Sequence, residues 1–345
     1  MKKHLIATAV IAALTSPVIA QNVSISGYVE SGLENTKSSQ SGTADTTAFV
    51  SSVFGSSRLA ISGSEDLGGG IKAGFRLESS LDLTTGRFGA TTLGTQANNP
   101  IFNRGAELNL SGAFGTIAFG KLDHNGIENN EAALSAITGN ISLGTSTSST
   151  YGANVEATEA ASDANGTLRF TTPAFNGVQL ELGWTPSDNG TTALAAYGAT
   201  GAHEGIRSAQ LRGTLADVNF RVGGGRVSQA AGDIDVRGFS IGYNFGVAEV
   251  GVSYQNQDNP GSTADAKETI IGFKVPLGGG LDVRGNYRTI DVAGGTTSDA
   301  TQQVVALAKA LSKRTTVYGM FRNTDLDVST GNDTKELGVY VSHTF

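Results

Sequence analysis

Alternation of apolar and polar residues at every second position runs through nearly the whole chain, and it constrains the fold more than any other feature of the sequence. Sixteen short segments carry this alternation, and hardly any helical periodicity lies between them. The pattern predicts an all-β chain that forms one structural unit. The segments are residues 23–30, 57–63, 71–79, 105–111, 116–120, 167–172, 178–184, 209–215, 219–227, 234–245, 248–255, 268–275, 281–289, 303–311, 315–322 and 335–345.

The connections between these segments alternate between short and long. Tight turns are predicted at Gly68–Gly70, Asn176–Gly177 and Gly278–Gly280, whereas the longest connection runs from Leu122 to Gly166. Tight turns on one side and longer loops on the other are typical of a transmembrane β-barrel, whose strands need about 9–11 residues to span the bilayer.

Strands can cross lipid only when every backbone N–H and C=O group is paired, so the sheet must close on itself. We therefore predict a 16-stranded antiparallel transmembrane β-barrel over residues 21–345. A soluble β-sandwich would show the same alternation. A sandwich of that size needs a bulky aromatic core, however, and the apolar positions here are mostly Val, Leu, Ile and Ala.

The N-terminal residues predict a secretory signal peptide. Lys2 and Lys3 precede an apolar run from Leu5 to Leu14, and small residues lead up to Ala20. That run has ten residues, too few for a membrane-spanning helix. We expect residues 1–20 to be the signal peptide, cleaved after Ala20 when the chain is exported through the inner membrane.

Composition excludes several classes of protein. No stretch after the signal peptide reaches the roughly 18 apolar residues of a membrane-spanning helix. The chain has no cysteine, so disulfides, thiolate chemistry and cysteine-ligated metals are excluded. Its formal net charge of −7 argues against nucleic-acid binding, which needs a basic surface.

The two parities of each strand predict which face meets lipid. In the segment that starts at Ile71, Phe75 and Leu77 share the apolar parity, while Lys72 and Arg76 lie on the other. In a wide barrel the apolar face contacts lipid and the charged face lines water. The apolar parity of the last segment ends in Phe345, whose ring suits a membrane boundary.

Several longer motifs recur in a fixed order. The most specific is SRLAISGSEDLGGGIKAGFRLE, residues 57–78, and Leu110–Gly120, Tyr243–Ala248 and Leu311–Thr315 follow it. In this order and spacing they resemble the Gram-negative general porins, most closely the trimeric 16-stranded proteobacterial type. Phe345 looks like the C-terminal signal that the outer-membrane assembly machinery reads. The resemblance covers essentially the whole mature chain.

The resemblance implies an outer-membrane porin, a water-filled channel for passive diffusion of ions and small hydrophilic solutes. It also implies a homotrimer that contacts outer-membrane lipid and lipopolysaccharide. Two alternatives stay open: a substrate-preferring channel of the same fold, and a barrel that acts mainly as an adhesin or receptor through its outer loops. A sugar-selective channel would need a track of inward aromatic rings, and Tyr28, Tyr318 and Tyr340 are scattered on the first and last strands.

The resemblance further implies that the connection after strand five, Leu122 to Gly166, folds inward as a constriction loop. Its acidic residues would face a basic ladder and create a transverse field across a narrow aqueous gap. The acidic candidates on the loop are Asp123, Glu128 and Glu131. The basic candidates, which have the inward parity on strands two, three and six, are Arg58, Lys72, Arg76 and Arg169.

One departure weakens this ladder. Close relatives carry a basic residue on strand four, whereas this chain has Gly105, with Glu107 and Asn109 inward. The sign of the ion selectivity is therefore left open.

Patterns that carry catalysis are missing from the mature sequence. Its histidines are His124, His203 and His343, and no pair of them has the spacing of metal ligands. None lies near a Gly-x-Ser-x-Gly or comparable nucleophile elbow. We therefore expect no enzyme activity, no metal and no cofactor.

Overall fold

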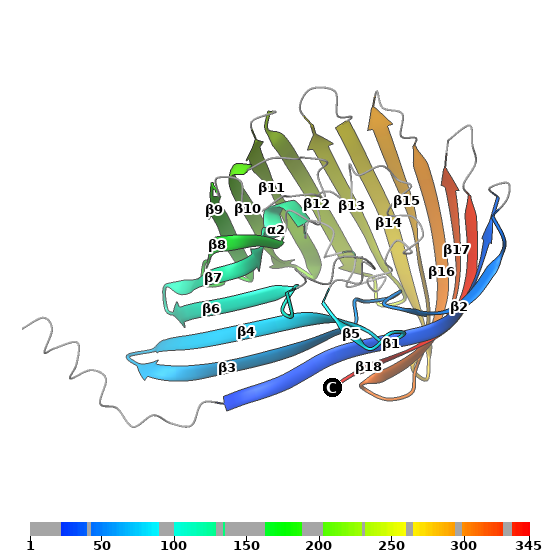
Figure 1. Ribbon diagram of the computed structural model, residues 1–345, viewed down its shortest axis with the longest axis horizontal. Coiled ribbons are helices and arrows are strands. Elements are labelled where there is room, and N and C mark those ends of the chain that lie inside the picture. Colours follow the sequence, from blue (N-terminus) through cyan, green and yellow to red (C-terminus); the bar gives the residue numbers. More distant parts are fainter. Residues whose placement is uncertain are drawn as a thin grey trace, which may run out of the picture.

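The computed structural model describes residues 22–39, 43–89, 100–128, 134, 163–187, 203–229, 232–259, 265–293, 299–326 and 333–345. Antiparallel strands make up most of these ranges and curve around one enclosed space (Figure 1). No helix in these ranges is long and apolar enough to cross a membrane.

Sixteen strands follow one another around the ring in chain order, each antiparallel to its neighbours. They are β1 (Asn22–Ser38), β3 (Arg58–Gly68), β4 (Ile71–Asp82), β6 (Gly105–Gly112), β7 (Gly115–Asp123), β8 (Asp163–Thr171), β9 (Val178–Pro186), β10 (His203–Leu215), β11 (Val218–Gln229), β12 (Ile234–Asn244), β13 (Glu249–Asp258), β14 (Asp265–Gly278), β15 (Leu281–Ala293), β16 (Ala300–Ala310), β17 (Thr315–Leu326) and β18 (Thr334–Thr344).

The ring closes through β1, which pairs with β18 on one edge and with β3 on the other. Tyr28 lies opposite Thr344 in the first pairing and opposite Arg58 in the second. Gly27 and Phe345 exchange two backbone hydrogen bonds, of 3.0 and 3.1 Å, which extend the closing ladder to the last residue. The predicted closed, 16-stranded antiparallel barrel is confirmed.

The second strand of the ring is interrupted. A short strand, β2 (Thr46–Ser51), pairs with the later half of β1, whose earlier half pairs with β3. β2 and β3 therefore share one place in the ring, and residues 52–57 leave the ladder between them. The connection predicted between residues 30 and 57 is thus largely strand, because β1 continues to Ser38 and the chain returns along it. The other short strand, β5 (Arg87–Phe88), pairs with the end of β4.

The predicted tight turns are confirmed at one end of the barrel. Gly68, Gly69 and Gly70 have φ values of 82°, 61° and 78° between β3 and β4. Asn176 and Gly177 have φ values of 48° and 83° before β9. A left-handed backbone costs a side-chain-bearing residue about 1–2 kcal/mol, so glycine is favoured at these positions.

The two faces of the barrel divide as predicted. Leu108, Phe119 and Leu337 expose 60%, 47% and 64% of their surface on the outward face. Side chains of the other parity, such as Glu78 and Gln210, are buried within the ring. An apolar exterior around a polar interior is the arrangement of a barrel in lipid.

Candidate functional site

Three arginines converge on one buried glutamate on the inner face of β3 and β4. Arg104 Nε lies 2.8 Å from Glu78 Oε1, and Arg58 Nε lies 3.9 Å from the same oxygen. Arg76 forms an ion pair with the other carboxylate oxygen of Glu78. Three guanidinium groups around one carboxylate leave an excess of positive charge on this wall. We call these four residues the arginine cluster.

Arg58 is held by two further contacts. Its Nη1 donates to the Ser56 carbonyl oxygen at 2.8 Å, and its guanidinium lies 5.5 Å from the centre of the Tyr28 ring. A guanidinium at this distance from an aromatic ring is attracted by the ring's quadrupole. The cation at the start of β3 is therefore fixed in position.

Arg104 was not among the predicted site residues. It stands directly before β6, and its backbone N–H donates to the Glu78 carbonyl oxygen at 3.2 Å. The neighbouring Asn103 is also bound to β4: its Oδ1 accepts a hydrogen bond from Ser80 N, and its Nδ2 donates one to Ser80 Oγ, both at 2.9 Å. Arg104 thus supplies a cation beside the strand on which the predicted ladder has none. The sequence signal for Arg104 is its position one residue before the predicted strand 105–111.

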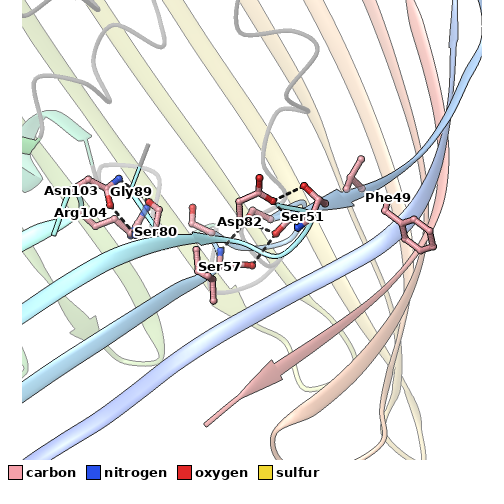
Figure 2. A pocket seen from close by; sticks show the side chains of 13 residues that line it. Phe49, Ser51, Ser57, Ser80, Asp82, Gly89, Asn103 and Arg104 are labelled. Carbon is pink, nitrogen blue, oxygen red and sulfur yellow. Dashed lines mark hydrogen bonds between the residues drawn. The ribbon is translucent and has the colours of Figure 1, made fainter. Parts of the chain in front are cut away.

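A polar pocket adjoins the arginine cluster (Figure 2). Ser51 and Ser57 lie on one side of it, and Ser80, Asn103 and Arg104 lie on the other. Hydroxyl and amide groups of this kind keep the wall beside the cations wetted.

The other predicted basic residues lie apart from Arg58 and Arg76. Arg169, on β8, pairs with Glu107 on β6 at 3.2 Å and donates to the Asp123 carbonyl oxygen at 3.4 Å. Lys72 lies near the tight-turn end of β4, opposite Asp66 and Ser111. The predicted basic ladder is therefore divided among three places. Arg58 and Arg76 share Glu78, and Arg169 pairs with Glu107. Lys72 lies closer to the tight turn between β3 and β4.

Several other inward basic side chains pair with acids of their own. They are Arg212 with Glu181, Lys274 with Glu249, Arg284 with Asp282, Arg288 with Glu268, and Arg322 with Glu34 and Glu336. The arginine cluster gathers three described cations on one acid, whereas Arg212 and Arg221, opposite each other on β10 and β11, share Glu181.

The chain that follows β7 enters the barrel. His124 is fully buried, with Nδ1 2.9 Å from Ser208 Oγ and Nε2 2.7 Å from Thr185 Oγ1. The short helix α2 (Asn125–Glu128) then contacts β9, β10, β11 and β12, and it lies inside the ring in Figure 1.

Close packing fixes α2 to that wall. Gln210 Nε2 donates to the Asn125 carbonyl oxygen at 2.6 Å, and Asn125 donates to the Glu181 carboxylate. A Cβ on Gly126 would lie 2.5 Å from the Ala209 carbonyl oxygen, so only glycine fits there. Ile127 is fully buried. These contacts arise from residues that lie far apart in the sequence.

The three predicted acidic loop residues have different positions. Asp123 is the last residue of β7, so it belongs to the wall and not to the loop. Glu128 is the last residue of α2. Glu131 lies outside the described residues, as do residues 135–162 of the same connection.

The model of one protein family, the Gram-negative porins, matches residues 7–329 of the chain. The chain belongs to this family. Outer membrane porin protein 32 of Delftia acidovorans is similar to this porin, with 29% identity over 302 residues that cover 84% of this chain and 80% of the relative.

Solved porin structures share the fold. The anion-selective porin from Comamonas acidovorans superposes with a TM-score of 0.73 at 24% identity, over 94% of this chain and all of that chain. The OmpF structure from Salmonella typhi in complex with daunomycin superposes with a TM-score of 0.67 at 11% identity, over 94% of this chain and 97% of that chain. The predicted resemblance to the Gram-negative porins is confirmed, and this porin is an outer-membrane channel for passive diffusion.

Proposed function

We propose that this porin passes small hydrophilic solutes and ions with a preference for anions. The arginine cluster carries the proposal. An excess of guanidinium groups on a low-dielectric wall raises the local concentration of anions in the water beside it. The similar porin from Comamonas acidovorans is described as anion-selective, which supports the same preference here.

The test is the reversal potential of the purified porin in a planar bilayer under a potassium chloride gradient. Arg104→Gln and Arg58→Gln should each shift the reversal potential toward that of a cation-preferring pore. Lys309→Gln is the matched control, because Lys309 Nζ bonds the Gly279 carbonyl oxygen at a tight turn. Equal reversal potentials in all four proteins would contradict the proposal.

We also propose that the connection after β7 is the constriction loop. Its first residues, His124 to Ile127, contact the inner face of β9–β12, which supports this role. Glu128 and Glu131 are the proposed acidic residues of the loop, with Asp123 on the wall at the end of β7 beside them, and Arg58, Lys72, Arg76 and Arg169 are the proposed basic ones. Glu128→Gln should shift the reversal potential in the direction opposite to Arg58→Gln.

For assembly and export, we propose a homotrimer whose mature subunit, residues 21–345, begins after cleavage at Ala20. A similar Vibrio cholerae structure, OmpT at 15% identity and a TM-score of 0.61, is described as a trimer form. The mass of the purified protein tests the cleavage site, and threefold closing steps in bilayer recordings test the trimer. Phe345 is the proposed assembly signal, and outer-membrane lipid and lipopolysaccharide are the proposed surroundings.

Passive diffusion needs no chemistry, and we propose that the porin is not an enzyme. The alternative of a sugar-preferring channel is disfavoured by the inward tyrosines. Tyr340 is fully buried and Tyr318 is 9% exposed, so neither offers a ring face to a sugar. Liposome-swelling rates that depend on solute size alone, and not on sugar identity, are the expected result.

A further inference from the structure

Residues 52–57 form a closed loop that leaves the second strand of the ring. Ser52, at its start, has a φ of 69°, a left-handed conformation that few residues with side chains adopt. Ser57 N donates to Ser52 Oγ at 2.9 Å and closes the loop at its base. We call this loop the inner lip.

Glu30, on β1, fixes the inner lip. Its Oε1 accepts hydrogen bonds from the backbone N–H groups of Val53, at 2.6 Å, and Phe54, at 2.9 Å. Tyr28 donates its hydroxyl to the other carboxylate oxygen, and Glu30 N donates to Ser57 Oγ at 3.0 Å. Glu30 is fully buried. Hydrogen bonds to a carboxylate are about twice as strong as neutral ones, so the Glu30 side chain holds the first half of the lip, while the Glu30 backbone holds its last residue, Ser57.

Phe54 fixes the tip of the inner lip against β17 and β18, the last two strands of the ring. Its ring stacks on Tyr318 with 4.0 Å between ring centroids, and it meets the edge of Tyr340 at 5.5 Å. These rings belong to a buried apolar cluster with Val53, Val304, Ala306, Ala308 and Met320.

This cluster lies on the inner face of the barrel. On the same strands, Phe321, Val339 and Val341 have the opposite parity and expose 44%, 59% and 49% of their surface outward. Tyr318 and Tyr340, which lie directly opposite each other in register, therefore point inward. The inner lip covers an apolar stretch of wall that would otherwise face the water of the channel.

The inner lip and α2 occupy opposite walls. The lip contacts β1, β16, β17 and β18, whereas α2 contacts β9, β10, β11 and β12. In the ring of sixteen strands, β10 is eight places from β18, which is halfway around. Two inward elements therefore approach the channel from facing sides.

We propose that the inner lip is a second narrowing element of this porin, which sets the size limit of the channel together with α2 on the facing wall. The lip also positions the arginine cluster, because Ser56 accepts the hydrogen bond from Arg58 that directly follows it. Glu30 and Phe54 are thus positioning residues for both the width and the charge of the channel.

The first test compares Phe54→Ala and Glu30→Gln with the wild-type porin in planar bilayers and in liposome swelling. Because permeation through an aqueous pore depends on its diameter, single-channel conductance should rise about 1.5-fold in both variants, and larger sugars should enter. Phe49→Ala is the matched control. Phe49 lies on β2, just before the lip, but is 73% exposed, and its ring stands at the far end of the pocket in Figure 2.

A second test does not depend on loosening the lip. The chain has no cysteine, so a single cysteine at position 56, a part-exposed position of the inner lip that lines the pocket, reacts alone with a small anionic thiol reagent. Reaction at Ser56→Cys should lower the current of open channels, whereas reaction at Phe49→Cys should leave it unchanged. A conductance that is unchanged in Phe54→Ala, together with a current that is unchanged on labelling position 56, would overturn the proposal.

Discussion

The ring of Phe345 occupies the space that a side chain on Gly27 would fill. A Cβ built on Gly27 would collide with the Phe345 ring and lie 2.7 Å from the Arg58 carbonyl oxygen. The same two residues exchange both backbone hydrogen bonds that end the β1–β18 ladder. The aromatic terminus is therefore fixed against the first strand by packing as well as by hydrogen bonding.

Gly27→Val should displace the Phe345 ring and destabilise the closed barrel by about 1–3 kcal/mol, the usual cost of forcing extra volume into a packed site. The measurement is the unfolding temperature of the folded barrel in detergent, followed by circular dichroism and by gel mobility. Gly319→Val is the control, because a Cβ at Gly319 meets no atom within 4 Å. Equal losses in both variants would contradict a specific role for Gly27.

Removal of the His124 ring should loosen the start of the loop after β7. His124→Ala removes the ring nitrogens that contact the hydroxyl groups of Ser208 and Thr185; Thr185 keeps its hydrogen bond to Thr167 Oγ1 at 2.6 Å, so the loss falls mainly on Ser208. An unsatisfied buried polar group costs about 1–3 kcal/mol. We expect noisier single-channel currents and faster proteolysis of the loop, with the unfolding temperature of the strands little changed. Quiet currents in this variant would show that α2 is held without His124.

Loss of Arg322 should be among the most destabilising changes in the barrel wall. Arg322 is 1% exposed, forms an ion pair with Glu336, and lies 3.8 Å from Glu34. Arg322→Leu leaves two carboxylates buried without their cation, which costs about 3–5 kcal/mol for a broken buried pair. Urea unfolding measures this loss. Arg226→Ala, which removes an exposed ion pair to Asp235, should change the midpoint far less.

The turn between β10 and β11 offers a stabilising change. Ala216 and Asp217 have φ values of 47° and 66°, although neither is glycine. Ala216→Gly should stabilise the barrel by about 1 kcal/mol, because a left-handed backbone costs alanine about that much. Ala118→Gly, within β7, should act in the opposite direction. A lower urea midpoint for Ala216→Gly would show that the turn is not strained.

The strands and tight turns could be predicted because their signals are local. Alternation along a strand and glycine in a turn are properties of neighbouring residues, and Gly68–Gly70 shows both the pattern and the positive φ values. Closure of the ring followed from the cost of unpaired backbone groups in lipid.

The inner lip and the arginine cluster depend on contacts that no local pattern records. Phe54 meets Tyr318 and Tyr340 from the far end of the chain, so residues 52–57 look in sequence like part of a polar connection. Arg104 escaped the parity argument because it stands just outside its strand. Side chains that bend around a strand end cannot be assigned to a face by counting alternate positions.

Closure through β1 has a consequence for how the chain matures. The first strand synthesised finds one of its neighbours, β3, early, but its other neighbour is β18, which emerges last. Until the final residues arrive, two rows of unpaired N–H and C=O groups stay open to other chains. A product that lacks β18 therefore carries two unpaired strand edges that can pair with other chains, and closure of the barrel requires β18 itself.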